Sequence, residues 1–204
     1  MDLKIRQACK SDYKEIELLT REAFWNIYKP GCDEHLVVHN MHRNKRSIEE
    51  LELVAVCSNK IVGHILYSQG YIKGIDNNTF LTFGPLSVSP SLQNKGIGSS
   101  LVETSLEKAY DLGVSAVFIT GNPDYYSRFG FQSASKYGIY LDGISSDDDC
   151  PYFMVKILKK NVLQNMSGIY IFDKCFYVDS SELSEFEKQF PYKKKEVREG
   201  QLHT

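Results

Sequence analysis

The sequence lacks the features that mark several common classes of protein. Its five cysteines are odd in number and form no C-x-x-C pair, which argues against a disulfide framework and against a zinc ribbon. No stretch approaches the roughly 18 apolar residues of a membrane span. The amino terminus turns charged at once and has no apolar core of a signal peptide. We therefore expect a soluble, cytoplasmic protein with no membrane partner.

A large excess of one charge is also missing. The formal net charge is -2, with 24 Lys and Arg against 26 Asp and Glu, so no nucleic-acid partner is expected. Hydrophobic residues make up 42% of the 204 residues, which is ordinary for a globular protein and enough to build one domain with a sizeable core. We find no internal repeat and no low-complexity segment.

Hydrophobic periodicity near the amino terminus predicts a strand followed by two helices. Residues 3–7 alternate as a strand does. A helix is expected after Asp12, which has Glu15 at the spacing of a capping box, and its apolar stripe stops near Pro30-Gly31. A second short helix is expected at 33–43.

Val- and Ile-rich runs then predict several strands. The runs at 51–57 and 60–68 flank the turn signal Ser58-Asn59, so they predict an antiparallel hairpin. Residues 79–88 predict a strand that Gly84-Pro85 interrupts, because proline removes a ladder donor and glycine permits a bulge. Later strands are expected at 114–119, 137–141, 152–158 and 169–178.

The segment 79–119 predicts a β-α-β unit. Its helix runs from Gly96 to about Asp111 and stops at Gly113, and a crossover helix requires parallel flanking strands within a mixed sheet. We expect a single α/β domain at 1–178, followed by a helix and a charged, frayed tail at 179–204.

Two glycines between a strand and a helix predict an anion site. In Gln93-Asn94-Lys95-Gly96-Ile97-Gly98, the first helical N–H groups are unpaired and the glycines let a phosphate come close. A Walker loop would need the lysine after the last glycine, and a dinucleotide fingerprint would need a third glycine. Taken alone, the segment fits an ordinary helix start equally well.

Two motifs together resemble the GNAT superfamily of N-acetyltransferases. Gln93 to Gly98 matches the family signature [QR]-x-x-G-x-[GA] at every fixed position. Asn122-Pro123-Asp124-Tyr125-Tyr126-Ser127-Arg128-Phe129-Gly130-Phe131 resembles a later motif, in the Y-Y-x-R-F-G-F form of one branch of small acetyltransferases. That branch also shares a Phe-Met-Val strand and a closing aromatic strand, matched here by Phe153-Met154-Val155 and Phe176-Tyr177. The resemblance covers about residues 3–158.

The resemblance implies a fold, a co-substrate and a binding site. The fold would be a mixed central sheet with antiparallel N-terminal strands, a splayed parallel pair at the acetyl-CoA site and flanking helices. The reaction would be direct acetyl transfer from acetyl-CoA to an amine of a small molecule, a protein N-terminus or a lysine, in a monomer or homodimer. The residues implied to bind acetyl-CoA are Leu86, Ser87, Val88, Gln93, Asn94, Lys95, Gly96, Ile97, Gly98, Ser99 and Asn122.

The resemblance also implies a catalytic role for Tyr126, four residues before Gly130. A tyrosine hydroxyl stays protonated at neutral pH and can donate its proton to the departing thiolate. Its neighbour Tyr125 is interpreted as a packing residue. Asn122 either caps the following helix only or also touches the pantetheine arm.

No general base can be assigned. Residues 79–88 carry no Asp or Glu, and His64 lies in an apolar run where a histidine is more often hydrogen-bonded in the core. A water relay, or an amine that arrives neutral, is equally consistent. The alternative function is an acyl-CoA-binding sensor without turnover. The residues that choose the acceptor are expected on the first helices and in the loops 70–78 and 142–150.

The second predicted helix carries a group that has three interpretations. His35, His39 and His42 lie near one helical face, with Cys32 just before them, so the four could bind a metal, contact the acceptor, or lie on the surface without a special role. No H-E-x-x-H motif is present. We favour a surface role and expect no metal. Lys193-Lys194-Lys195 is interpreted as part of a solvated tail.

Overall fold

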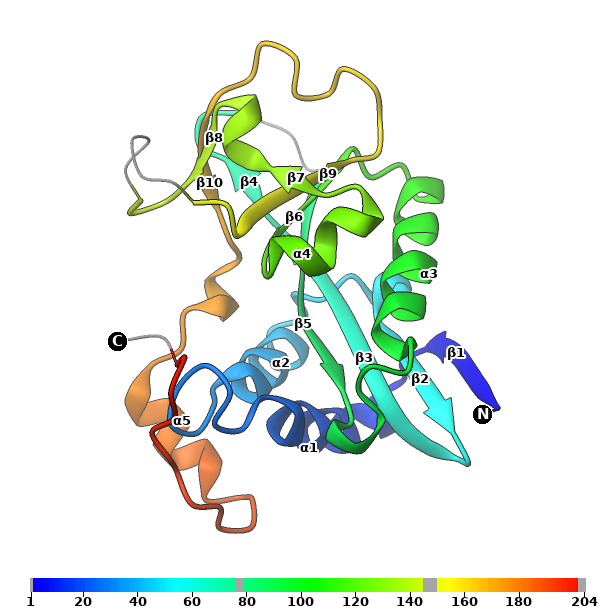
Figure 1. Cartoon of the computed structure of the whole chain (residues 1–204), viewed down its shortest axis with the longest axis vertical. Coiled ribbons are helices and arrows are strands. Elements are labelled where there is room, and N and C mark those ends of the chain that lie inside the picture. Colours follow the sequence, from blue (N-terminus) through cyan, green and yellow to red (C-terminus); the bar gives the residue numbers. More distant parts are fainter. Residues whose placement is uncertain (1, 76–78, 145–149, 202–204) are drawn as a thin grey trace. The chain divides into compact units, whose positions relative to one another are not determined.

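The computed structural model describes residues 2–75, 79–144 and 150–201 (Figure 1). The chain forms two compact units. The first consists of Met1–Leu66, Pro85–Leu101 and Lys174–Thr204, and the second of Tyr67–Gly84 and Val102–Asp173. Among the described residues, every helix is too short or too polar to cross a bilayer.

Three antiparallel strands form the sheet of the first unit. They are β1 (Leu3–Gln7), β2 (Leu53–Cys57) and β3 (Lys60–Gln69), and Ala55 of β2 lies opposite Ile5 on one side and Gly63 on the other. The predicted hairpin is confirmed. Its two turn residues have φ of 49° and 60°, the left-handed conformation that a two-residue hairpin turn requires.

Two helices pack on this sheet, as the apolar stripe predicts. They are α1 (Tyr13–Phe24) and α2 (Glu34–Arg43), and they lie side by side in Figure 1. Their shared core contains Ile16, Leu19, Val37, Val38, Met41, Val54, Ile61 and Leu66. The predicted capping box at Asp12 is wrong. Its carboxylate instead pairs with Arg6 at 2.6 Å and accepts from the backbone N–H of Cys9 at 2.8 Å, before the helix begins.

The β-α-β unit is confirmed. It consists of β5 (Phe80–Val88), α3 (Ile97–Asp111) and β6 (Ala116–Thr120), and β5 pairs with β6 in parallel from Phe80 to Thr82. The expected interruption of β5 does not occur, although Gly84 has φ of +146°, a conformation that side chains rarely adopt. The strand order of the central mixed sheet is β1-β2-β3-β5-β6-β9-β7, which establishes a mixed α/β fold.

The second unit contains the rest of that sheet and a small one. Antiparallel β9 (Phe153–Ile157) and β7 (Gln132–Ser133) follow β6, as the Phe-Met-Val match predicts for β9. The small sheet, which we did not anticipate, has the order β4 (Tyr71–Ile72), β10 (Gly168–Ile171) and β8 (Ile139–Leu141). Its central Tyr170 stacks on Phe118 at 4.1 Å and hydrogen-bonds Thr82 at 2.7 Å, so the two sheets share one aromatic core.

The predicted closing strand is wrong. The strand expected at 169–178 ends at Ile171, and a 3-10 helix over Lys174–Phe176 takes the place of the aromatic strand that we assigned to Phe176-Tyr177. The helix α5 (Ser180–Glu187) follows, capped by Asp179, whose carboxylate accepts from two backbone N–H groups. The chain beyond α5 does not fray as expected, since its residues up to Gln201 hydrogen-bond the end of α1.

Candidate functional site

The end of β5 is fixed in the first unit by a buried hydroxyl pair. Ser87 is fully buried, and its Oγ donates to Thr20 Oγ1 of α1 at 2.9 Å. Leu86 and Val88, on the other side of the strand, are partly exposed. The backbone at this end therefore lies at the surface of the unit, with its conformation set by a contact to α1.

The loop after β5 presents unpaired backbone donors. Asn94 and Gly96 have φ of 59° and 84°, and residues 93–96 are exposed. The helix α3 starts at Ile97, and its first intrahelical bond runs from Ser100 N to Gly96 O at 2.9 Å. The N–H groups of the first three helical residues therefore point out of the helix end, where an anion gains from both hydrogen bonds and the helix dipole.

Gly96 has room around it, and Gly63 has none. A Cβ added at Gly96 would meet no atom within 4 Å, so space for a ligand remains at its backbone. A Cβ at Gly63 of β3 would lie 2.9 Å from both Ile97 Cγ2 and Leu101 Cδ1. Gly63 thus lets the first turn of α3 pack tightly on β3. We missed this role, although a glycine inside a Val- and Ile-rich strand is a known sign of close approach.

The second unit holds the Tyr-Tyr motif. The helix α4 (Pro123–Tyr126) is capped by Asn122, whose Oδ1 accepts from Asp124 N at 2.9 Å. The ring of Tyr126 covers Gly121 so closely that a Cβ there would collide with it. Its ring centroid is 5.8 Å from that of Phe83 and 5.9 Å from that of Phe131. The ring position of Tyr126 is therefore set by packing on several sides.

Tyr125 is held differently. The guanidinium of Arg128 lies 4.1 Å from its ring centroid, a cation–π distance, and Arg128 Nε donates to its carbonyl at 2.8 Å. These contacts support the packing role that we predict for Tyr125. The capping role of Asn122 is confirmed, and its contact with pantetheine stays a prediction.

His64 lies in the core, as the alternative that we favoured predicts. Its Nε2 is 3.3 Å from Glu52 Oε1, and His42 Nε2 is 2.6 Å from the same oxygen. Burial lowers the pKa of His64. Burial alone would raise the pKa of Glu52, but hydrogen bonds from the two histidines outweigh it and lower that pKa to about 2. His64 is thus a core partner of a carboxylate.

The three histidines of α2 do not form one group, and Cys32 lies before that helix. His35, His39 and His42 each contact a different carboxylate, from Glu187, Glu17 and Glu52. The side chain of His35 is fully buried and that of His42 is only 5% exposed, so the surface role that we favoured is wrong for them. Among the described residues, no three His, Cys, Asp or Glu side chains are grouped as a metal site requires. The carboxylates come from distant segments, which a local sequence pattern cannot reveal.

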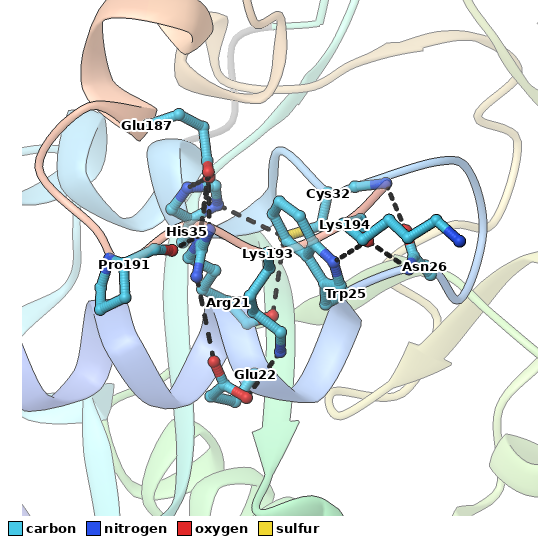
Figure 2. A network of polar contacts seen from close by, with 11 residues as sticks. Arg21, Glu22, Trp25, Asn26, Cys32, His35, Glu187, Pro191, Lys193 and Lys194 are labelled. Atoms are coloured by element: carbon cyan, nitrogen blue, oxygen red, sulfur yellow. Dashed lines mark hydrogen bonds and ion pairs between the residues drawn. The ribbon is translucent and has the colours of Figure 1, made fainter. Parts of the chain in front are cut away.

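Cys32, His35 and Glu187 stand in the order of a thiol hydrolase triad (Figure 2). Cys32 Sγ is 3.5 Å from His35 Nδ1, and His35 Nε2 is 2.6 Å from Glu187 Oε1. However, burial strongly raises the pKa of the Cys32 thiol and lowers the pKa of His35 to about 4. A buried thiol that keeps its proton is not a nucleophile, so this arrangement is structural.

Glu34, the first residue of α2, has an unusual proton affinity. Burial raises the pKa of its carboxyl to about 7, and the neighbouring charge of Asp33 adds to the effect. Lys29 works against it and pairs with Asp33. A carboxyl with this pKa can release and accept protons at neutral pH, which is one of the properties that a general base needs. Residues 76–78 and 145–149 of the predicted acceptor loops lie outside the described residues.

Comparison with known sequences identifies related proteins. A model of the acetyltransferase (GNAT) family matches residues 14–131. The chain is 32% identical over 124 residues to YjhQ, an uncharacterized N-acetyltransferase of Escherichia coli K12, and the match covers 60% of this chain and 66% of YjhQ. It is 25% identical over 173 residues to YhbS, another uncharacterized N-acetyltransferase of the same strain, with 84% of this chain and 97% of YhbS covered.

Solved structures share the fold. Escherichia coli YhbS in complex with CoA has a TM-score of 0.76 at 23% identity, covering 85% of this chain and 91% of that one. A GNAT family acetyltransferase of Brucella melitensis in complex with acetyl-CoA has a TM-score of 0.71 at 24% identity, covering 86% and 98%. At these identities the likeness establishes the architecture described above.

Proposed function

Because the chain belongs to the acetyltransferase (GNAT) family, an acyltransferase family, we propose that it transfers an acetyl group from acetyl-CoA to a primary amine. The observation that carries this proposal is the loop from Gln93 to Ser99, where Gly96 is open to a ligand and three helical N–H groups point outward. This loop would hold the pyrophosphate of acetyl-CoA. Leu86, Ser87 and Val88 would pair with the pantetheine arm through their backbone, as an added strand does.

The proposed reaction has no covalent intermediate. The amine nitrogen attacks the thioester carbonyl, the C–S bond breaks, and the amide forms. The nitrogen loses one proton and the CoA thiolate gains one. Holding both substrates in one site lowers the barrier, and Tyr126 is the group that we propose donates the proton to the thiolate. The complexes of YhbS with CoA and of the Brucella protein with acetyl-CoA support acetyl-CoA as the acetyl donor.

A thiol-release assay tests this function. We expect acetyl-CoA to release CoA when incubated with the chain and at least one amine from a panel of polyamines, aminoglycosides and peptides with free N-termini. Calorimetry would measure acetyl-CoA binding in parallel. Binding without release for every amine would favour the sensor function, which the lack of a carboxylate in β5 first suggested. Absence of binding would contradict both functions.

We also propose that Glu34 accepts the proton of the amine. The support is that β5 has no carboxylate, that His64 is buried against Glu52, and that the pKa of Glu34 is raised to about 7. Below that pH the carboxyl holds a proton and cannot accept another. Turnover is therefore expected to fall toward acid pH and to level off above about 7.

Glu34→Gln is expected to lower kcat/KM by about 100-fold and to abolish the acid limb, because a general base contributes about 100-fold or more. Asp33→Asn is the matched control. It removes the charge that raises the pKa of Glu34, so the acid limb should move to lower pH while turnover persists. The measurement is kcat/KM between pH 5 and 9. An unchanged profile in Glu34→Gln would rule out this role.

A further inference from the structure

We call the segment from Asp179 to Gln201 the strap, and Figure 2 shows its contacts with the end of α1 and the residues after it. It contains α5 and the chain that follows. Glu187, Pro191, Lys193 and Lys194 of the strap all contact α1 or the turn after it. We call residues 25–33, between α1 and α2, the turn.

Glu187 attaches the strap through buried charge. Its carboxylate accepts from Nε and Nη2 of Arg21, with Arg21 Nη2 to Glu187 Oε2 at 2.9 Å, and its Oε1 lies 2.6 Å from His35 Nε2. The side chain of Arg21 is only 2% exposed and that of His35 is fully buried. Glu187 thus ties α5 to both helices that flank the turn. A buried charge that loses its partner is strongly unfavourable, so this contact has one stable arrangement.

The turn itself is bound through Trp25 and Asn26. Both side chains donate to the carbonyl of Lys194, at 3.0 and 3.1 Å. Asn26 Oδ1 accepts from Glu196 N at 3.1 Å and from Gly31 N at 2.7 Å, so one side chain joins the strap to both ends of the turn. Asn26 also has φ of 61°, which asparagine tolerates better than most residues.

Along the chain, the turn connects two helices that carry residues of the proposed site or contact it. The helix before it contacts β5 through the Thr20–Ser87 hydroxyl pair, and the helix after it begins with Glu34. We propose that Glu187 is a positioning residue that, through the strap, fixes the turn in the conformation that receives the amine acceptor. This inference rests on the proposed function. The strap would determine how well the amine is used and would leave acetyl-CoA binding unchanged.

Trp25 is the single tryptophan of the chain and is buried under the strap, so its fluorescence reports the state of the strap directly. In Glu187→Gln we expect the Trp25 emission to shift to longer wavelength. We expect kcat/KM for the best amine of the panel to fall at least tenfold, with acetyl-CoA affinity within twofold of the wild type. Glu185→Gln is the matched control, because Glu185 lies on the same helix, its side chain is 73% exposed, and it pairs with the exposed Lys188.

Asn26→Gly serves as the second variant if Glu187→Gln does not fold. Glycine keeps the left-handed backbone and removes the side-chain bonds to Lys194, Glu196 and Gly31, so the same split between amine use and acetyl-CoA binding is expected. A shifted Trp25 emission with unchanged amine use overturns the proposal, and so does an equal loss of acetyl-CoA affinity. A wild-type chain that binds acetyl-CoA but releases no thiol with any amine overturns the proposed function as well. Failure of the proposed function is distinguishable from failure of the strap proposal, because in the former the wild-type chain itself releases no thiol.

Discussion

Gly96→Asp is expected to weaken acetyl-CoA binding by about 100-fold or more. The added carboxylate would stand at the open backbone position where we propose the pyrophosphate lies. Two like charges about 4 Å apart near a protein surface repel by about 4 kcal/mol, which is enough for this loss. The positive φ of 84° adds backbone strain for any side chain other than glycine. Calorimetric titration of acetyl-CoA is the measurement.

Two variants separate charge from shape. Gly96→Asn has the same size as aspartate and tolerates the left-handed backbone, but carries no charge, so it should lose much less affinity. Gly74→Asp places the same carboxylate at another glycine with φ of +80° and open surroundings, and should leave acetyl-CoA binding unchanged. Equal affinities for wild type and Gly96→Asp would refute the pyrophosphate site.

Tyr126→Phe is expected to lower kcat by about 100-fold, the effect typical of losing a general acid. The substitution removes only the hydroxyl and keeps the ring that packs on Phe83, Phe131 and Gly121. Acetyl-CoA affinity should therefore stay within twofold. Loss of kcat without loss of binding is the pattern of an interaction made mainly in the transition state. Stopped assays of thiol release at saturating amine measure it.

Tyr125→Phe is the neighbouring control. Arg128 stacks on the ring of Tyr125, which the substitution keeps. Loss of the Tyr125 hydroxyl should therefore not change kcat. If both variants turn over at the wild-type rate, Tyr126 is a packing residue. If both variants lose activity equally, the cause is a loss of stability of α4 and the Tyr-Tyr motif. A lower unfolding temperature of both variants would show this.

The sequence was most informative where the signal was local. Ser58 and Asn59 predict the hairpin because a two-residue turn needs two residues that accept positive φ, and both have it. Gly113, with φ of 83°, ends α3 as a C-terminal glycine does. The predicted strand, loop and helix around Gly96 are also confirmed, and Gly96 has a positive φ of 84°. Its role as an acetyl-CoA site is still a prediction.

Several of the errors have one physical cause, which is pairing with a residue that the local pattern does not include. Asp12 fits a capping box locally, but Arg6 competes for its carboxylate. His35 and His42 have helical spacing typical of an exposed face, yet their side chains are 0% and 5% exposed and pair with the carboxylates of Glu187 and Glu52. The charged tail has the composition of a frayed end, but Trp25 and Asn26 bind its backbone, which composition does not describe. Glu34 would not attract notice from sequence, because its proton affinity depends on burial.

The pairing of Arg21 with Glu187 also bears on how the chain folds during synthesis. The two residues are 166 positions apart, so α1 leaves the ribosome long before the carboxylate that neutralises its buried guanidinium exists. Closing so long a loop costs chain entropy before any contact compensates, and contacts of this separation slow folding. The amino-terminal helices therefore reach their final packing only after translation of the strap. Until then, Arg21 and Trp25 lack the contacts that the strap makes with them.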